Sequence, residues 1–211
     1  LIGLVESLAG AAVLIPEFES YTEGKPVPPT LLGDATHPVA GSVLGIEIRT
    51  QDAEELRYYV LRQLTDRYAA ERGIEVTQAE REVYANQMRK AMESDPNLRD
   101  AADDSEEDRA AHEEIAGAFI RQWKINKALY EHYGGRVVFQ QGGPEPLDAY
   151  RRFLEESRAR GDFEIVSGPL ETAFWRYYRD ESIHSFFPPG SPEEQSVFAV
   201  PPWGSGRNRG S

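Results

Sequence analysis

Gly41-Ser-Val-Leu-Gly-Ile-Glu-Ile48 opens the stretch that decides the fold, residues 41–96. Its weak alternation of apolar and polar residues predicts a single strand or a small hairpin that turns at Gly45. A helix is expected to follow, and Gly73 is expected to end it. The reason is that apolar residues recur every four positions along one face: Leu56, Val60, Leu64 and Tyr68.

Two capping patterns mark where the helices of this stretch begin. Asp52, with Glu55 three residues later, predicts the start of the first helix. Thr77 with Glu80 predicts the start of a second helix in the same way. Pro96 is expected to close that helix, because the residue before a proline is driven out of helical geometry.

The composition limits the classes of protein that fit the sequence. The chain has 211 residues, of which 40% are hydrophobic, enough for a packed core in one domain or two small ones. Its formal net charge is −13, from 36 acidic and 23 basic residues. Such a surface repels phosphate backbones and anionic lipids, so we expect no nucleic-acid partner.

The sequence offers little for metal binding or covalent catalysis. There is no cysteine, which excludes disulfides, thiolate ligands and cysteine nucleophiles. The four histidines are far apart along the chain; two of them, His112 and His132, are separated by about 30 Å on one predicted helix. Neither a nucleophilic serine motif nor a phosphate-binding glycine loop occurs. We therefore expect no metal and no cofactor.

The N-terminal region, residues 1–40, is expected to be a helix followed by a proline-rich arm. Apolar residues in 1–15 predict an ordinary helix, and the alternative is the remnant of an export region that could anchor a longer form of the protein. No stretch reaches the ~20 apolar residues of a membrane span, so stable membrane insertion is not expected. Five prolines between 16 and 40 predict an extended arm, which could join copies of the chain into a homo-oligomer.

The remaining sequence predicts a mainly α fold with a small α+β part at the C-terminal end. Residues 41–135 are expected to be a helical domain that ends in a long helix, stopped by Gly134-Gly135. Residues 136–203 are expected to be the α+β part, and 204–211 a flexible tail. Within that part we expect a strand from Arg136, a turn at 142–144, helices over 145–160 and from Pro169, a short strand or helix extension at 162–166, and a final strand at 197–200.

Aromatic residues are concentrated in the second half of the chain, more densely than one apolar helix face can hold. Most are expected to form the core. The rest could line an apolar groove for polypeptide segments, to which methionines would add an adaptable surface. The candidate peptide-binding residues are Met88, Met92, Trp123, Tyr130, Phe174, Trp175 and Tyr178.

Residues 39–135 resemble the N-terminal domain of SurA-type periplasmic chaperones. The resemblance is carried by Val39-Ala-Gly-Ser-Val-Leu-Gly-Ile-Glu-Ile-Arg-Thr50, by Leu56 to Tyr68, and by Gly73-Ile-Glu-Val-Thr-Gln-Ala-Glu80. It implies an exported, periplasmic protein that binds unfolded or extended polypeptides without ATP.

The strand from Arg136, the helix at 145–160 and Gly161-Asp-Phe163 resemble the opening of a parvulin-type prolyl isomerase domain, the domain that follows in this family. Val138 and Phe139 stand where that family carries a catalytic histidine, and no partner for the second catalytic position is found. The resemblance therefore implies a shortened, degenerate isomerase segment with no catalytic residues.

Two other functions remain open. One is an enzyme of an unrecognised fold, with a site between the two halves that uses Glu131, His132 or Tyr133. The other is a structural or assembly subunit whose proline-rich arms, 16–40 and 187–203, wrap around a neighbouring protein.

Overall fold

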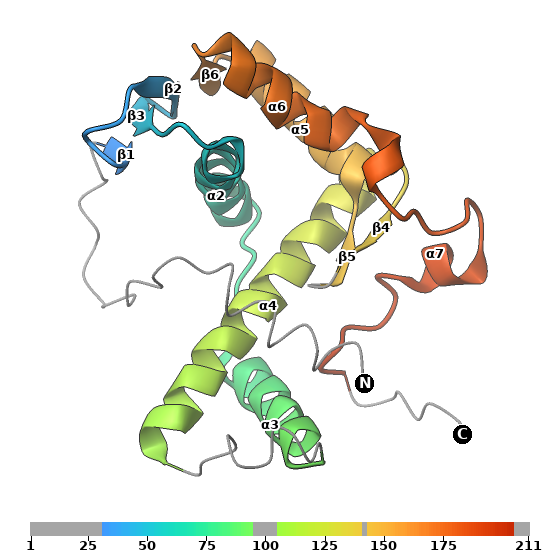
Figure 1. Cartoon of the computed structure of the whole chain (residues 1–211). Helices are drawn as coiled ribbons and strands as arrows, with labels where there is room; N and C mark the ends of the chain where they lie inside the picture. Colours follow the sequence, from blue (N-terminus) through green and yellow to red (C-terminus); the bar gives the residue numbers. More distant parts are fainter. Residues whose placement is uncertain (1–30, 95–104, 141–142, 205–211) are drawn as a thin grey trace.

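The computed structural model describes residues 31–94, 105–140 and 143–204 (Figure 1). The expectation of a mainly helical fold is confirmed, because six α-helices make up most of this part of the chain. The helices are α2 (Ala53–Glu71), α3 (Gln78–Ser94), α4 (Glu106–Tyr133), α5 (Leu147–Ala159), α6 (Gly168–Arg179) and α7 (Pro192–Ser196). A short 3-10 helix, η2 (Glu181–Ile183), follows α6.

A four-stranded sheet joins the first described strands to a strand from the second half of the chain. Its strand order is β1-β3-β2-β6. The strands are β1 (Leu31–Gly33), β2 (Val39–Val43), β3 (Ile46–Arg49) and β6 (Phe163–Ile165). β1 runs parallel to β3, while β2 is antiparallel to both β3 and β6. The sheet is therefore not confined to the C-terminal part, where the sequence placed the α+β structure.

The first strands correct the expectation of an arm that reaches residue 40. Residues 31–33 and 39–40 lie in β1 and β2, so the last ten residues of the expected arm belong to the sheet and its connections. The rest of the arm lies outside the described residues. The hairpin at Gly45 is confirmed: Leu44 and Gly45 have φ of 50° and 81° between β2 and β3. A two-residue turn with both φ positive matches the twist of the strands it joins.

Both predicted helix starts in residues 41–96 are confirmed. The Asp52 carboxylate accepts hydrogen bonds from the backbone N–H groups of Glu54 and Glu55, at 2.7 and 2.9 Å. The Asp52 N–H donates a hydrogen bond to Thr50 Oγ1 at 3.0 Å. Glu55 therefore does not accept from that N–H and does not complete the reciprocal pair of bonds called a capping box. At α3 the box is complete, because Glu80 Oε2 accepts from Thr77 N–H at 2.9 Å and Thr77 Oγ1 accepts from Glu80 N–H at 3.3 Å.

α4 is the long helix that the sequence predicts, and it crosses the molecule diagonally in Figure 1. Ser105 caps it by accepting a hydrogen bond from Asp108 N–H at 3.1 Å. Acidic side chains fill its first turn, where they face the positive end of the helix dipole. The predicted stop is confirmed at Gly134, whose φ is 62°.

The second half differs from its prediction at two places. β4 (Val138–Gln140), α5, β6 and α6 are confirmed, but Gly143 and Pro144 belong to strand β5 (Gly143–Glu145), which pairs with β4. The turn itself falls on residues 141–142, outside the described part. The expected strand at 197–200 is wrong, because Ala199 N–H bonds to Ser196 O at 3.0 Å and continues a turn from α7.

The described residues form two cores. The first core lies between the sheet and helices α2, α5 and α6, and it includes the C-terminal half of α4 through Ile125 and Leu129. The second core lies between α3 and the N-terminal half of α4. Figure 1 shows α3 beside the lower part of α4, while α5 and α6 lie at its other end. α4 thus supplies residues to both cores.

The first core takes residues from both sides of Gly134-Gly135. α2 packs against α6, and β2 against β6. The approach of β2 to β6 is close at Gly41, where an added Cβ would lie 2.1 Å from Glu164 O. Arg67 on α2 also makes two hydrogen bonds to the Asp162 carboxylate, at 2.8 and 2.6 Å. The segment after Gly135 therefore completes the sheet and core that the first strands begin.

Within the described ranges, no helix combines the length and apolar composition needed to cross a bilayer.

Candidate functional site

The most distinctive surface of the described chain is made by α3 and the part of α4 that ends at Trp123. We call it the α3–α4 surface and define it by Tyr84, Met88, Phe119 and Trp123. Met88 is 3% exposed and Tyr84 6% exposed. The two helices approach closely because Gly117 leaves room for the Arg81 side chain. The α3–α4 surface thus combines an adaptable thioether with three aromatic rings.

The C-terminal segment 197–204 covers the α3–α4 surface. Trp203 lies edge-to-face against Trp123, with ring centroids 5.2 Å apart, and 6.0 Å from Tyr84. Phe198 contacts the other side of this aromatic group, 5.9 Å from Trp123 and 5.3 Å from Tyr130. Trp203 and Phe198 are only 8% and 5% exposed. The segment is therefore held by two aromatic anchors, both in contact with Trp123.

Hydrogen bonds between the segment and the helices are few and long. Gln87 Nε2 donates to Trp203 O at 3.3 Å, and Lys127 Nζ donates to Phe198 O at 3.5 Å. The backbone bonds at Ala199 and Gly204 are local, to Ser196 and Pro201. Aromatic packing rather than backbone pairing accounts for the attachment of this segment.

An ion pair holds the start of α3 against α4 beside the covered surface. Lys124 Nζ lies 2.7 Å from Glu80 Oε1 and also donates to Glu75 O at 2.7 Å. Partial burial alone would raise the pKa of Glu80, but the hydrogen bonds from Lys124 and Thr77 outweigh it and lower that pKa to about 2. Glu80 therefore stays charged at any pH near neutral.

An open hollow of ≈ 460 Å³ lies where the loop after α2, helix α4 and the C-terminal segment meet. Lys124, Lys127 and Glu131 form its polar side, and Trp123, Pro201 and Trp203 its apolar side. Lys127 also pairs with Glu131 at 2.9 Å. The hollow gives solvent access to the edge of the docked segment.

The structure separates the predicted peptide-binding residues into two groups. Met88, Trp123 and Tyr130 lie together at the α3–α4 surface or beside the docked segment, and Met92 is half-buried further along α3. The other three lie in the first core, where they are 0%, 4% and 2% exposed: Phe174, Trp175 and Tyr178. In this conformation those three offer no surface to a peptide.

Sequence reasoning missed Phe198 and Trp203 as members of the site. The signal was present as two aromatic residues flanking Val200-Pro-Pro202 in the proline-rich arm 187–203. An arm with aromatic anchors is typical of a segment that docks on an apolar surface. Nothing in the local sequence specifies that the surface is on α3 and α4.

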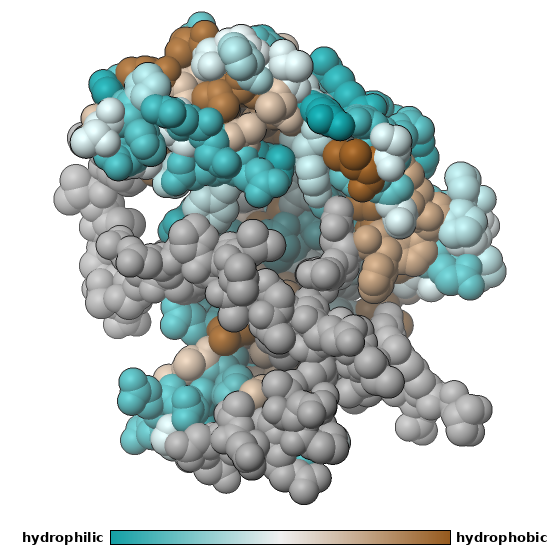
Figure 2. Space-filling model, viewed as in Figure 1, coloured by the Kyte–Doolittle hydropathy of each residue, from teal (hydrophilic) through white to brown (hydrophobic). Residues whose placement is uncertain are grey.

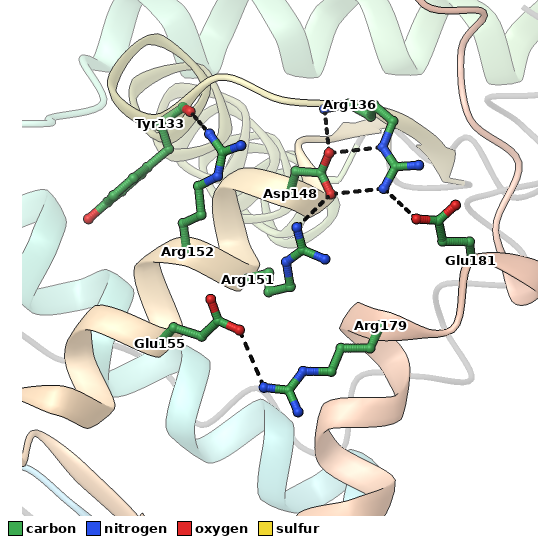
Figure 3. Close-up of polar contacts among 8 residues, drawn as sticks. All are labelled: Tyr133, Arg136, Asp148, Arg151, Arg152, Glu155, Arg179 and Glu181. Atoms are coloured by element: carbon green, nitrogen blue, oxygen red, sulfur yellow. Dashed lines mark hydrogen bonds and ion pairs between the residues drawn. The ribbon is translucent and has the colours of Figure 1, made fainter.

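A second polar group, drawn in Figure 3, anchors the turn after α4. The Asp148 carboxylate accepts from Arg136 N–H and Nε, both at 2.9 Å, and from Arg136 Nη2 at 3.2 Å. Arg136 also donates to Glu181 at 2.8 Å, and Arg151 lies 3.6 Å from Asp148. Burial alone would raise the pKa of Asp148, but the Arg136 hydrogen bonds lower it. With its oxygens used by arginines, Asp148 serves as a structural tie.

The residues of the alternative enzyme site do not converge. Tyr133 donates its hydroxyl to Glu156 at 2.8 Å, and burial together with this bond raises the pKa of Tyr133 to about 12. Glu131 pairs with Lys127, and His132 is exposed with its ring against Tyr133. Glu131 therefore has a different partner from Tyr133, while the rings of His132 and Tyr133 contact each other.

A buried carboxyl group lies between α6 and the β4–β5 hairpin. Glu145 accepts a hydrogen bond from the Tyr177 hydroxyl at 2.7 Å, and Arg57 lies 4.1 Å from the centre of the Tyr177 ring. Burial raises the pKa of Glu145. Next to it the Tyr178 hydroxyl is buried without a hydrogen-bond partner in the described part of the chain. This group lines neither the hollow beside the C-terminal segment nor the open hollow between Glu171 and Asp180.

On the face drawn in Figure 2, hydrophilic residues cover most of the described surface, and the hydrophobic patches are separated from one another. The largest exposure of a big apolar side chain is 66%, at Phe139 on β4. In the described ranges no three His, Asp or Glu side chains are grouped as metal ligands.

Comparisons with known proteins found no matching family model, no similar curated protein and no similar solved structure.

Proposed function

We propose that the protein is an ATP-independent, chaperone-like protein that binds polypeptide segments lacking regular structure, and that the α3–α4 surface is its binding site. The observation that carries the proposal is the docking of residues 197–204 on that surface. Those residues form neither helix nor strand, contain two prolines, and are held mainly by two aromatic rings. A surface that accommodates such a segment has the chemistry to accommodate others like it.

The acidic composition supports the same role. A net charge of −13 keeps a protein with a bound apolar segment in solution and repels nucleic acid. The proposal places the protein in the periplasm, as the SurA-like pattern in residues 39–135 suggests. It includes no prolyl isomerase activity, because Val138 and Phe139 offer no catalytic side chain. Isomerase turnover in a proline-peptide assay would contradict that part.

The test is suppression of aggregation of an unfolded outer-membrane protein, followed by light scattering without ATP. We expect suppression near a one-to-one ratio by the wild-type chain. Trp123→Ala removes the ring that both Phe198 and Trp203 contact. This variant is expected to change the molar ratio of chain to unfolded protein that is needed for suppression. Phe139→Ala, on an exposed β4 position, is the control and is expected to act like wild type. No suppression by the wild-type chain at any ratio would exclude the proposed role.

The docked arm also favours a second candidate function, that of an assembly subunit. The same aromatic anchors could fasten the arm to a neighbouring protein instead of to α3 and α4. This function predicts a stable complex whose mass, measured by light scattering, falls when residues 187–203 are removed. A chain that stays monomeric at all concentrations and alone suppresses aggregation favours the chaperone role.

A further inference from the structure

We propose that residues 197–204 are an internal ligand of the α3–α4 surface, displaced by polypeptide segments that carry two aromatic side chains five residues apart with prolines between them. This inference rests on the proposed function and names the class of segment recognised and the way access is controlled. The spacing is that of Phe198 and Trp203, separated by Ala-Val-Pro-Pro.

The ring geometry sets the spacing. The Trp123 ring contacts both anchors, 5.9 Å from the Phe198 ring and 5.2 Å from the Trp203 ring, both in edge-to-face arrangements. Aromatic pairs of this kind contribute beyond the area they bury. A segment whose two aromatic residues have another spacing is expected to contact Trp123 with one ring but not with both.

The prolines between the anchors lower the cost of docking. Pro201 and Pro202 restrict the backbone before it binds, so less conformational entropy is lost. Proline also has no backbone N–H that would require a partner at an apolar surface. Val200, between the anchors, is 43% exposed, so this position puts little constraint on the displacing segment.

The attachment is suited to exchange. In the described chain, residues 197–204 join no sheet, and α3 and α4 hold them with the two long hydrogen bonds from Gln87 and Lys127. The segment follows Pro188-Pro-Gly190 and the five-residue helix α7, and it can leave without breaking the first core. Because it is tethered, its effective concentration at the surface is on the order of millimolar. External segments therefore compete against a constant internal ligand.

The test uses the full chain and a fluorescent peptide with the sequence of residues 195–204, QSVFAVPPWG. Binding is measured by fluorescence anisotropy with wild type and with Phe198→Ala/Trp203→Ala, in which the internal ligand has lost both anchors. We expect the double variant to bind the peptide at least ten-fold more tightly than wild type does. A peptide with alanine at both aromatic positions is expected not to bind.

The control is Phe139→Ala/Phe187→Ala, which removes an aromatic pair 6.2 Å apart outside the second core. This variant is expected to bind the peptide like wild type. If Phe198→Ala/Trp203→Ala loses helical circular dichroism, the single variant Phe198→Ala, which keeps Trp203, is measured instead. It is also expected to bind the peptide more tightly than wild type does. A folded variant that binds no more tightly than wild type overturns the inference, and so does equal binding of the alanine peptide.

The mass in solution tests whether the α3–α4 surface is occupied by the segment of a second copy of the chain. A wild-type dimer that the double variant lacks would mean that the segment docks on another chain, which overturns an internal ligand. Tighter peptide binding by the variant without any suppression of aggregation would support the internal ligand and remove the chaperone role. Suppression that persists while neither chain binds the peptide would overturn the internal ligand alone.

Discussion

The two cores differ in what closes them. The first core is closed by hydrogen-bonded strands from both halves of the described chain, by residues of four helices and by the Arg67–Asp162 pair. The second core is closed by two helices and by an irregular segment that ends at Trp203. Loss of the first core requires breaking the sheet, whereas the second core can open by release of one segment. Opening of the second core alone is therefore expected to cost less free energy than opening of the first, because no strand pairing is lost.

The largest effect is expected from Phe174→Ala in the first core. This side chain is fully buried and contacts the rings of Phe163, Trp175 and Tyr178. Its removal should lower the free energy of unfolding by about 4 kcal/mol, measured by denaturant unfolding. The same change at Phe139, which is 66% exposed, should cost much less. Equal losses at the two positions would contradict the assignment of the first core.

The next effect is expected from Asp148→Asn, at the tie drawn in Figure 3. The variant leaves Arg136 with Glu181 as its remaining charged acceptor and removes the charge beside Gly135, so the turn after α4 loosens. Because Arg136 is one-third exposed, we expect a loss of about 2 kcal/mol rather than the value for a fully buried pair. Asp66→Asn, whose pair with Arg121 is also partly exposed, is the control. A smaller loss at Asp148 than at Asp66 would exclude the structural role.

A third effect is expected on the stability of the second core in acid, and it comes from Glu80. The folded-state pKa of Glu80 is about 2, below the 4.5 of an unperturbed glutamate, so its stabilisation is present above pH ~5 and is lost as the pH falls toward 2. Glu80→Gln should remove this contribution, about 2 kcal/mol at neutral pH, and flatten the acid side of the stability curve. Glu82→Gln, an exposed position on the same helix, should leave the curve unchanged. An unchanged curve in Glu80→Gln would contradict the Lys124 pairing.

The smallest effect is expected from Gln87→Ala. This change removes one long hydrogen bond to Trp203 O and should cost about 0.5 kcal/mol, too little to shift global unfolding clearly. Hydrogen exchange should instead quicken at the amides of Ala199 and Gly204 while α5 is unaffected. Uniformly faster exchange in both cores would mean that they do not open separately.

Local sequence was a good guide to the helices. The Asp52 and Thr77 caps, the four-residue spacing from Leu56 and the glycine stops at 73 and 134 depend on neighbours within one or two turns. The turn residues at 44–45 likewise specify the hairpin. Strands were harder, because a strand needs a partner that the local sequence does not name. Val197 to Val200 has a strand-like composition, yet it lies in a turn because Phe198 packs on α4.

The candidate site was only half predictable for the same reason. Aromatic composition identified Trp123 and Tyr130, but it gave equal weight to Phe174 and Trp175, which the first core buries. Burial depends on how α6 packs against α2 and α5, a contact between distant parts of the chain.

The sequence by itself determined helices α2 to α6, the caps at Asp52 and Thr77 and the acidic composition, because each depends on short-range backbone geometry or on residue content. Only the tertiary structure decided that β6 completes the sheet begun by β2, that α4 serves two cores, and that Trp203 covers the α3–α4 surface. These features arise from the burial of apolar side chains far apart in sequence, and burial depends on the packing of the whole chain.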